Sequence, residues 1–163
     1  MPTSKAEVEV TPSMLDRLTD LEPDSTKERQ LSSWEEMRRV KESLCRDLAD
    51  LLNTRRAEQD FDSAYEQATN SLLSFGITDF TSYNLKSEVE QERVRRSIER
   101  VIRQFEPRLS RVTVLMEKPD PVRSLLRFQV EATLETDLAA EAILFDLTLH
   151  RESRRIAVSG ANS

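Results

Sequence analysis

The sequence is poor in the residues that most catalytic and metal sites require. It contains one cysteine, Cys45, and one histidine, His150, among 163 residues. A single cysteine cannot form an internal disulfide, and one thiol with one imidazole falls short of the three or four ligands of a zinc site. We therefore expect both residues to be chemically inert and the protein to carry no metal or cofactor.

Glycine is also scarce, with two residues in the whole chain. The glycine-rich loops that bind phosphates and the G-x-S-x-G turn of serine hydrolases are therefore absent. Paired carboxylates, as in a glycosidase, remain available, and Glu106 is the nominal acid. However, a chain with 30 acidic residues always offers some pair, so abundance alone identifies no cleft. We expect the protein not to be an enzyme.

Long apolar runs and blocks of one charge are missing as well. No run approaches the ~18 apolar residues of a membrane span, and the polar start "MPTSKAEVEV" lacks the apolar centre of a signal peptide. The 24 basic and 30 acidic residues are interspersed, with a net charge of −6. No polybasic stripe points to nucleic acid or anionic lipid. These absences predict a cytoplasmic protein with no nucleic-acid partner and no direct membrane insertion.

The N-terminal 30 residues contain one short amphipathic stretch, "PSMLDRLTDLEP". Leu15, Leu18 and Leu21 recur at a spacing of three, which predicts one or two helical turns with an apolar edge. A helix this short is marginal on its own and needs a contact to stabilise it. Two interpretations stay open: the helix packs on its own domain, or it docks on a partner protein.

Two helices are predicted in the next part of the chain. Ser33 and Glu36 match a capping box, and an apolar face follows as far as "LLNTRR". Asn53 and the arginines after it suit a helix C-terminus, so this stretch has a local explanation. A second, shorter helix is predicted from about Phe61 to Phe75. Its apolar positions are Phe61, Tyr65, Ala68, Leu72 and Phe75, and Gly76 follows as its C-cap.

A third helix begins at a second capping box, Ser87 with Glu90. Its apolar stripe consists of Val94, Ile98, Val101, Ile102 and Phe105. The outer face allows ion pairs at a spacing of four, Glu92 with Arg96 and Glu99 with Arg103. This face is either plainly solvated or meets an acidic partner, and the sequence leaves both open.

After Arg108 the apolar period changes from 3.6 to 2. The alternation predicts half-buried antiparallel strands at 111–117, 126–135, 143–150 and 154–158. The two long strands are expected in the middle of the sheet, with either 111–117 or 154–158 at its edge. The predicted fold class is α+β, in two layers, with N-terminal helices packed on a C-terminal antiparallel β-sheet of three to four strands.

The junction "FEPRL" joins the third helix to the first strand. Pro107 disfavours helix at the residue before it, so the helix should stop at about Phe105. If 106–108 are extended, Glu106 and Arg108 point to one side and Pro107 points with Leu109 to the other. The two charges then either grip a partner or satisfy each other inside the domain. We expect charge reversal at either residue to leave a folded protein.

Five stretches resemble the type VI secretion baseplate subunit family TssE, which is itself similar to the wedge protein of contractile phage tail baseplates. They are "PSMLDRLTD" (12–20), "RDLADLLNTRR" (46–56), "SFGITDF" (74–80), "IERVIRQFEPRLSRVTV" (98–114) and "ILFDL" (143–147). Their order and spacing match the family over about residues 12–158. The resemblance implies a flexible segment at 1–30 with a short anchor helix, a baseplate wedge α+β domain at 31–158 and a disordered tail at 159–163.

The resemblance also implies a structural function in a six-fold baseplate at the cytoplasmic face of the inner membrane. The chain is expected to sit beside the wedge subunits TssF, TssG and TssK and to dock the contractile sheath, built of TssB and TssC. The sheath would add strands to an exposed sheet edge, so that its polymerisation starts on a fixed template. The alternative is a lysozyme-like peptidoglycan hydrolase, a name that family members have carried.

The residues expected to contact partners follow from the same resemblance. The Glu-Pro-Arg motif of the family maps onto Glu106, Pro107 and Arg108, where the arginine could make bidentate bonds to an acceptor. The remaining expected partner contacts are Leu15, Leu18, Asn53 and Arg55.

Overall fold

The computed structural model describes most of the predicted domain. The described residues are 32–56, 71–80, 82–84, 86–117, 125–135, 140–150 and 152–160, together with the single residues 18 and 67. Two α-helices, α2 (Ser33–Asn53) and α4 (Glu88–Phe105), precede a four-stranded sheet. The strands of this sheet are β3 (Leu109–Met116), β4 (Leu125–Glu135), β5 (Ala140–His150) and β6 (Ile156–Gly160).

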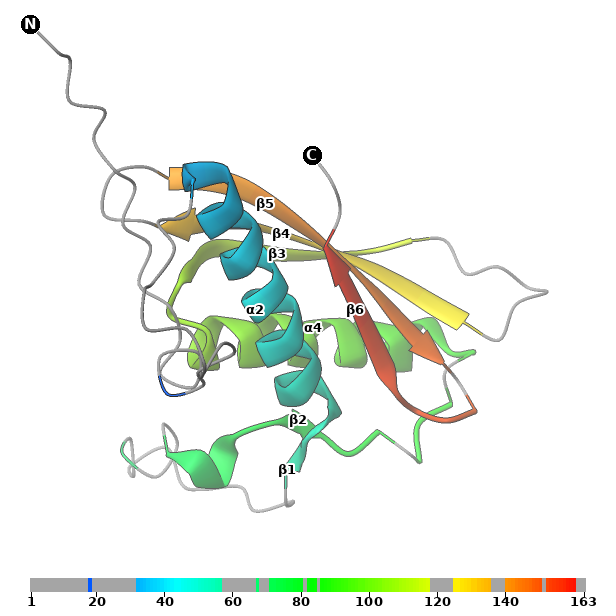
Figure 1. Ribbon diagram of the computed structural model, residues 1–163. Helices are drawn as coiled ribbons and strands as arrows, with labels where there is room; N and C mark the ends of the chain where they lie inside the picture. The colour runs from blue at the N-terminus through cyan, green and yellow to red at the C-terminus, as the bar shows by residue number, and fades with distance from the viewer. Residues whose placement is uncertain are drawn as a thin grey trace, which may run out of the picture.

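The sheet is an antiparallel meander in the order β3-β4-β5-β6, and both helices pack on one face of it (Figure 1). Buried and more exposed residues alternate along β4 and β5, so one face of the sheet is covered and the other is open. The predicted two-layer α+β class is confirmed. The two long strands lie in the middle, and both candidates for the edge are edges, because the meander leaves β3 and β6 each with one neighbour.

The core lies between the helices and the covered face. Phe128 and Phe145 fill its centre from the sheet, and Leu48 and Ile98 meet them from the two helices, each with at most 1% of its surface exposed. The predicted apolar stripes of both helices are confirmed, with Met37 and Phe105 partly buried at the margin. Gln91 is a buried polar residue on α4 that the pattern did not reveal.

Helix boundaries confirm some expectations and correct others. The helix α4 ends at Phe105, as the proline predicted. The capping box of α2 lies one residue earlier than expected, on Ser32 and Glu35, whose side chains each accept the other's backbone N–H. In the stretch "SSWEE" both Ser32 with Glu35 and Ser33 with Glu36 have the spacing of a capping box, so the sequence alone could not distinguish the two pairs. At Ser87 the N-cap position is correct, but its side chain makes no capping hydrogen bond.

The helix predicted from Phe61 to Phe75 is wrong at its end. Its first part lies outside the described residues, except for Gln67. Where the helix should continue, a short 3-10 helix, η1 (Leu72–Ser74), begins with Ser71 as its N-cap. Leu72, expected on the apolar face, is 85% exposed. The β6 strand runs to Gly160, two residues into the predicted disordered tail, because it pairs with β5 over that length.

A two-residue parallel pair joins the end of α2 to the segment before α4. In this pair β1 (Arg55–Arg56) lies beside β2 (Ile77–Thr78), and the Ile77 N–H donates to the Thr54 carbonyl at 2.9 Å. Gly76 makes the approach possible with a φ of 98°, a conformation that costs other residues strain. A Cβ atom here would lie 2.5 Å from the Thr54 carbonyl oxygen.

We predict that Gly76→Ala destabilises the protein by about 1–3 kcal/mol, because the methyl group meets backbone and φ is positive. Urea unfolding followed by circular dichroism measures the change. The second glycine is a matched control: at Gly160 a Cβ would meet Cys45 Sγ at 3.5 Å, an ordinary contact. Equal effects of Gly76→Ala and Gly160→Ala would contradict this account.

Candidate functional site

The acid of the Glu-Pro-Arg motif lies inside the protein. Glu106 follows the last residue of α4, where its backbone N–H donates to the Ile102 carbonyl at 2.9 Å, and it is 5% exposed. A buried carboxylate is costly unless a cation and hydrogen bonds compensate it. The position therefore requires a basic partner close by.

Arg108 is that partner. Its Nε donates to Glu106 Oε1 at 2.7 Å and its Nη2 to Glu106 Oε2 at 2.6 Å. The same Nη2 donates to Oδ2 of Asp47, on α2, at 2.6 Å. These bonds, with Glu106 first, raise the pKa of Arg108 against the opposing effect of burial. We call Asp47, Glu106 and Arg108 the junction triad, because it ties α2 to the turn between α4 and β3.

The backbone of the junction differs from the expected extended form. Pro107 and Arg108 lie in a turn closed by the Leu109 N–H, which donates to the Glu106 carbonyl at 3.2 Å. Pro107 is exposed whereas Leu109 is buried, so these two do not share a side. The two charges nevertheless meet, as one of the two interpretations expected. A reversed charge at Glu106 would stand buried, so we now expect such a variant to lose stability.

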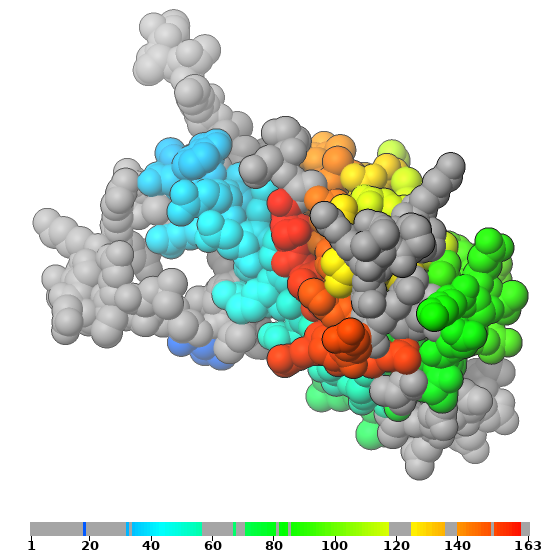
Figure 2. Space-filling model, turned by 90° about the vertical axis from the view of Figure 1, so that its right-hand side faces the viewer, coloured from blue at the N-terminus to red at the C-terminus, as the bar shows by residue number. Residues whose placement is uncertain are grey.

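Asn53 lies where α2 passes the edge of the sheet. Its side-chain Oδ1 accepts the Ile156 N–H at 3.0 Å, and its Nδ2 donates to the Ile156 carbonyl at 2.8 Å. The amide thus bonds both outward backbone groups of Ile156, as a residue of a neighbouring strand would. Figure 2 shows the red surface of β6 directly beside the cyan surface of α2.

Arg55 is also engaged within the chain. Its guanidinium lies 4.4 Å from the centre of the Phe80 ring and donates to the carbonyls of Leu52 and Arg154. Burial lowers the pKa of Arg55, and the charge of Asp79 opposes this effect.

The local explanation of "NTRR" is wrong for Asn53, which is the last residue of α2, with Thr54 as the C-cap, and whose amide bonds the distant Ile156. Both Asn53 and Arg55 nevertheless have structural uses. Their partner-binding role stays a prediction.

The two apolar residues expected to contact a partner, Leu15 and Leu18, belong to the N-terminal 30 residues of the sequence. Leu18 is 80% exposed, and Leu15 lies outside the described residues. Their role in partner binding stays a prediction, as does that of Pro107.

The outer edge of β3 is covered by side chains from α4, which the sequence did not reveal. The Val114 carbonyl accepts from Arg95 at 2.9 Å and the Val112 carbonyl from Arg103 at 3.0 Å. The Val114 N–H points to a carboxylate oxygen of Glu99 at 3.4 Å. A spacing of four places these three α4 residues on one stripe of the helix. Because this stripe lies next to the apolar stripe, the sequence could have indicated that these side chains lie close to the sheet.

The predicted ion pairs of α4 are confirmed and form a larger network. Glu92 bonds both Arg96 and Arg95 at 2.7 Å, and Glu99 bonds Arg95 at 2.7 Å and Arg103 at 2.8 Å. Hydrogen bonds from Arg95 and then Arg96 lower the pKa of Glu92 to about 2.

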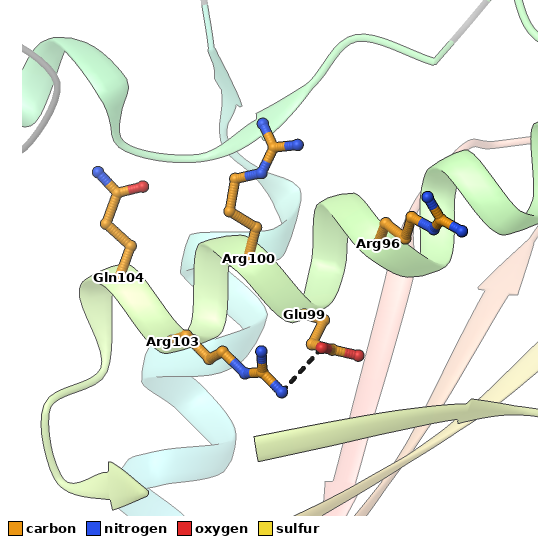
Figure 3. A pocket seen from close by; sticks show the side chains of 5 residues that line it. All are labelled: Arg96, Glu99, Arg100, Arg103 and Gln104. Carbon is orange, nitrogen blue, oxygen red and sulfur yellow. Dashed lines mark ion pairs between the residues drawn. The ribbon is translucent and has the colours of Figure 1, made fainter. Parts of the chain in front are cut away.

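A shallow pocket of about 360 Å³ lies on the outer surface of α4. It is lined by Arg96, Glu99, Arg100, Arg103 and Gln104. Figure 3 shows Arg103 paired with Glu99 on one side of the helix, whereas Arg100 and Gln104 extend from the other. Its one acid is held by two arginines, so this pocket lacks the pair of carboxylates that glycoside hydrolysis needs. An acidic partner for this face stays a prediction.

The described residues hold neither a metal-binding cluster nor a membrane-spanning helix. Among them no group of three His, Cys, Asp or Glu side chains is arranged to hold a metal ion. None of the described helices is long and apolar enough to cross a membrane.

Comparison with known proteins gives one match. The model of a family described as baseplate wedge protein gp25 matches residues 38–138, which is more than half of the chain. The matched region runs from α2 through β4 and contains the whole junction triad. No curated protein and no solved structure matches the chain.

We predict that Arg108→Met destabilises the protein by about 3 kcal/mol, because it leaves the Glu106 carboxylate buried without its cation. Adding Glu106→Gln should recover part of this loss. The free energy of unfolding in urea measures both effects.

Arg127→Met is the matched control. Arg127 lies 3.9 Å from Glu117, and both side chains are about half exposed, so its removal should change stability by no more than about 0.5 kcal/mol. If Arg108→Met is as mild as this control, the triad does not hold the junction.

The α4 network gives a pH dependence. The pKa of Glu92 is about 2 in the folded protein against an ordinary 4.5, so the charged form is favoured by folding. Its contribution is present above pH 4.5 and is lost as the pH falls toward 2. Because Glu92 is exposed enough for solvent to screen it, we expect a contribution of about 1 kcal/mol or less. The free energy of unfolding, measured in urea at several pH values from 6 to 2, should fall less steeply with pH for Glu92→Gln than for the unsubstituted chain. Equal pH dependence of the two proteins would exclude this contribution.

Proposed function

Since the chain belongs to the family of the baseplate wedge protein gp25, we propose that it is the subunit of a type VI secretion baseplate that docks the contractile sheath. Membership of the family gives the chain a structural role in a phage-tail-like baseplate. The single observation that carries the proposal is the match over residues 38–138, which covers nearly all of α2 and every element from there to β4.

The proposed mechanism is strand addition to the sheet. A strand edge presents unpaired N–H and C=O groups, which a partner strand satisfies while neighbouring side chains set the register. The sheet supports this use because two helices and the junction triad brace it from one face. A sheet edge held in a fixed position by the helices would give the first ring of sheath subunits a fixed template. Each sheath strand would then pair with the edge in one register, and polymerisation would start from that arrangement.

The partners in this proposal are the wedge subunits TssF, TssG and TssK and the sheath subunits TssB and TssC. The assembly would be six-fold and lie at the cytoplasmic face of the inner membrane. Leu18, with most of its surface exposed, supports a docking role for the N-terminal segment on a wedge subunit.

The hydrolase alternative has no observation in its favour. Both oxygens of the Glu106 carboxylate accept bonds from Arg108, and the residue is 5% exposed. A general acid in glycoside hydrolysis must reach the leaving-group oxygen in a cleft. Among the described residues, the Glu106 side chain is directed to Arg108 inside the junction rather than to solvent.

We predict that gentle isolation of the full chain from its source cell, through an affinity tag, brings down wedge and sheath subunits together. Mass spectrometry identifies the co-isolated proteins, and fluorescent sheath subunits report assembly in cells that lack the chain. Those cells should form no sheaths until the gene is restored.

A second measurement addresses the alternative. The purified chain should release no fragments from cell wall, and Glu106→Gln should make no difference. Recovery of the chain alone, or normal sheaths in cells that lack it, would contradict the proposed function.

A further inference from the structure

One arginine of α4 has no acidic neighbour on its own helix. Arg100 is exposed, and within the described part of the chain it forms no ion pair. Residues three and four apart are neighbours on a helix surface. Four other arginines of α4 each bond a glutamate at one of these spacings: Arg93, Arg95, Arg96 and Arg103. The corresponding neighbours of Arg100 are two arginines, a serine and a glutamine, at positions 96, 97, 103 and 104.

The helix dipole does not account for this charge. A dipole favours positive charge in the last turn of a helix, where Arg103 lies, and the effect falls off within that turn. Arg100 lies before the last turn. From position 96 to 104 the helix carries three arginines and one acid, Glu99, in a chain whose net charge is −6. This half of α4 is therefore a local excess of positive charge on an acidic protein.

Arg100 also lines the shallow pocket of about 360 Å³ on the outer surface of α4. Figure 3 shows Arg100 and Gln104 extending from the same side of the helix, whereas Arg103 and Glu99 pair on the other. A guanidinium presents its N–H donors in a planar fork, which matches the two oxygens of a carboxylate. The pocket thus offers a cationic donor to a carboxylate that another molecule supplies.

An exposed pair of leucines lies at the same end of α4. Leu72 and Leu73 of η1 are 85% and 65% exposed. The Ser71 side chain caps η1 by accepting the Leu73 N–H. Directly after η1, the Phe75 ring meets the ring of Phe105, the last residue of α4, at 5.4 Å between centroids. The two leucines are therefore held in place although they are exposed to water.

The charge and the leucines together form one surface. Figure 1 shows η1 on the side of the molecule where α4 ends. Single exposed leucines are common on soluble proteins, but an adjacent pair beside an unpaired cation favours a contact surface. We call Leu72, Leu73, Arg100 and Gln104 the α4–η1 surface.

We propose that the α4–η1 surface docks an acidic segment of a partner protein. Charge complementarity identifies the occupant: the segment places a carboxylate on Arg100 and a large apolar side chain against the leucines. The cation and the apolar pair then lose water together, which neither could do against an uncharged polar surface. The proposal goes beyond the proposed function, which concerns an edge of the sheet.

A photo-crosslinking benzophenone side chain at Leu72, introduced into the full chain in its source cell, tests the surface. Because Leu72 is exposed, this variant should stay folded. We expect a crosslink to another protein, in a peptide with more acidic than basic residues, which mass spectrometry identifies. The same group at Val89, which is 63% exposed at the other end of α4, should not reach that peptide. No crosslink from Leu72, or one to a second copy, to the chain's own residues or to a peptide without acidic excess, would overturn the proposal.

Arg100→Glu tests the charge. With the crosslinker at Leu72, this substitution should lower the crosslink yield by about tenfold or more, because it turns attraction into repulsion. Arg100→Lys keeps the charge but not the fork and should retain part of the yield. Arg39→Glu is the matched control, because Arg39 is an exposed arginine of α2 that also has no ion pair among the described residues. An unchanged yield with Arg100→Glu, or an equal loss with Arg39→Glu, would contradict the proposal.

A charge swap separates contact from stability. Circular dichroism should show that Arg100→Glu is folded. Replacing the acidic residue of the crosslinked peptide by arginine should then restore the yield of Arg100→Glu and lower that of the unsubstituted chain. If no such replacement restores the yield, Arg100 does not contact the partner and the proposal fails.

Discussion

A carboxylate without water around it must have a cation within reach, and Glu106 imposes this condition on the whole domain. Arg108 meets the condition only if the chain turns at Pro107, and the same guanidinium then reaches Asp47 on α2. One electrostatic requirement therefore links the end of α4, the start of the sheet and α2. The charged motif that looked like a surface feature is the centre of the junction.

The elements that depend on periodicity could be predicted from the sequence. The stripe of α4, its end at Phe105 and the two central strands follow from apolar spacing and proline geometry. The partners of polar side chains could not be predicted, because they come from distant parts of the chain. Asn53 reads as a local helix end, yet its amide bonds Ile156, 103 residues away. The capping frame of α2 was undecidable because two serines and two glutamates are adjacent.

The candidate site shows the same division. The resemblance pointed to Glu106 and Arg108, and spacing placed them close together, but only the structure shows that they bond each other inside the domain; their contact with a partner stays a prediction. The edges of the sheet were expected as open templates. Instead, side chains of α4 bond outward backbone groups of β3, and a side chain of α2 bonds those of β6. Backbone groups that are already bonded in this way make pairing of an isolated subunit with a wrong chain less favourable.

The contact between Asn53 and Ile156 also bears on the order of synthesis. The ribosome makes α2 long before β6, so the helix exists without the edge it later covers, and closing a loop of this length is entropically slow. The meander from β3 to β6 can form from neighbouring strands as they emerge. The edge of β6 therefore gains its Asn53 contact only after the last strand has been made and has met α2.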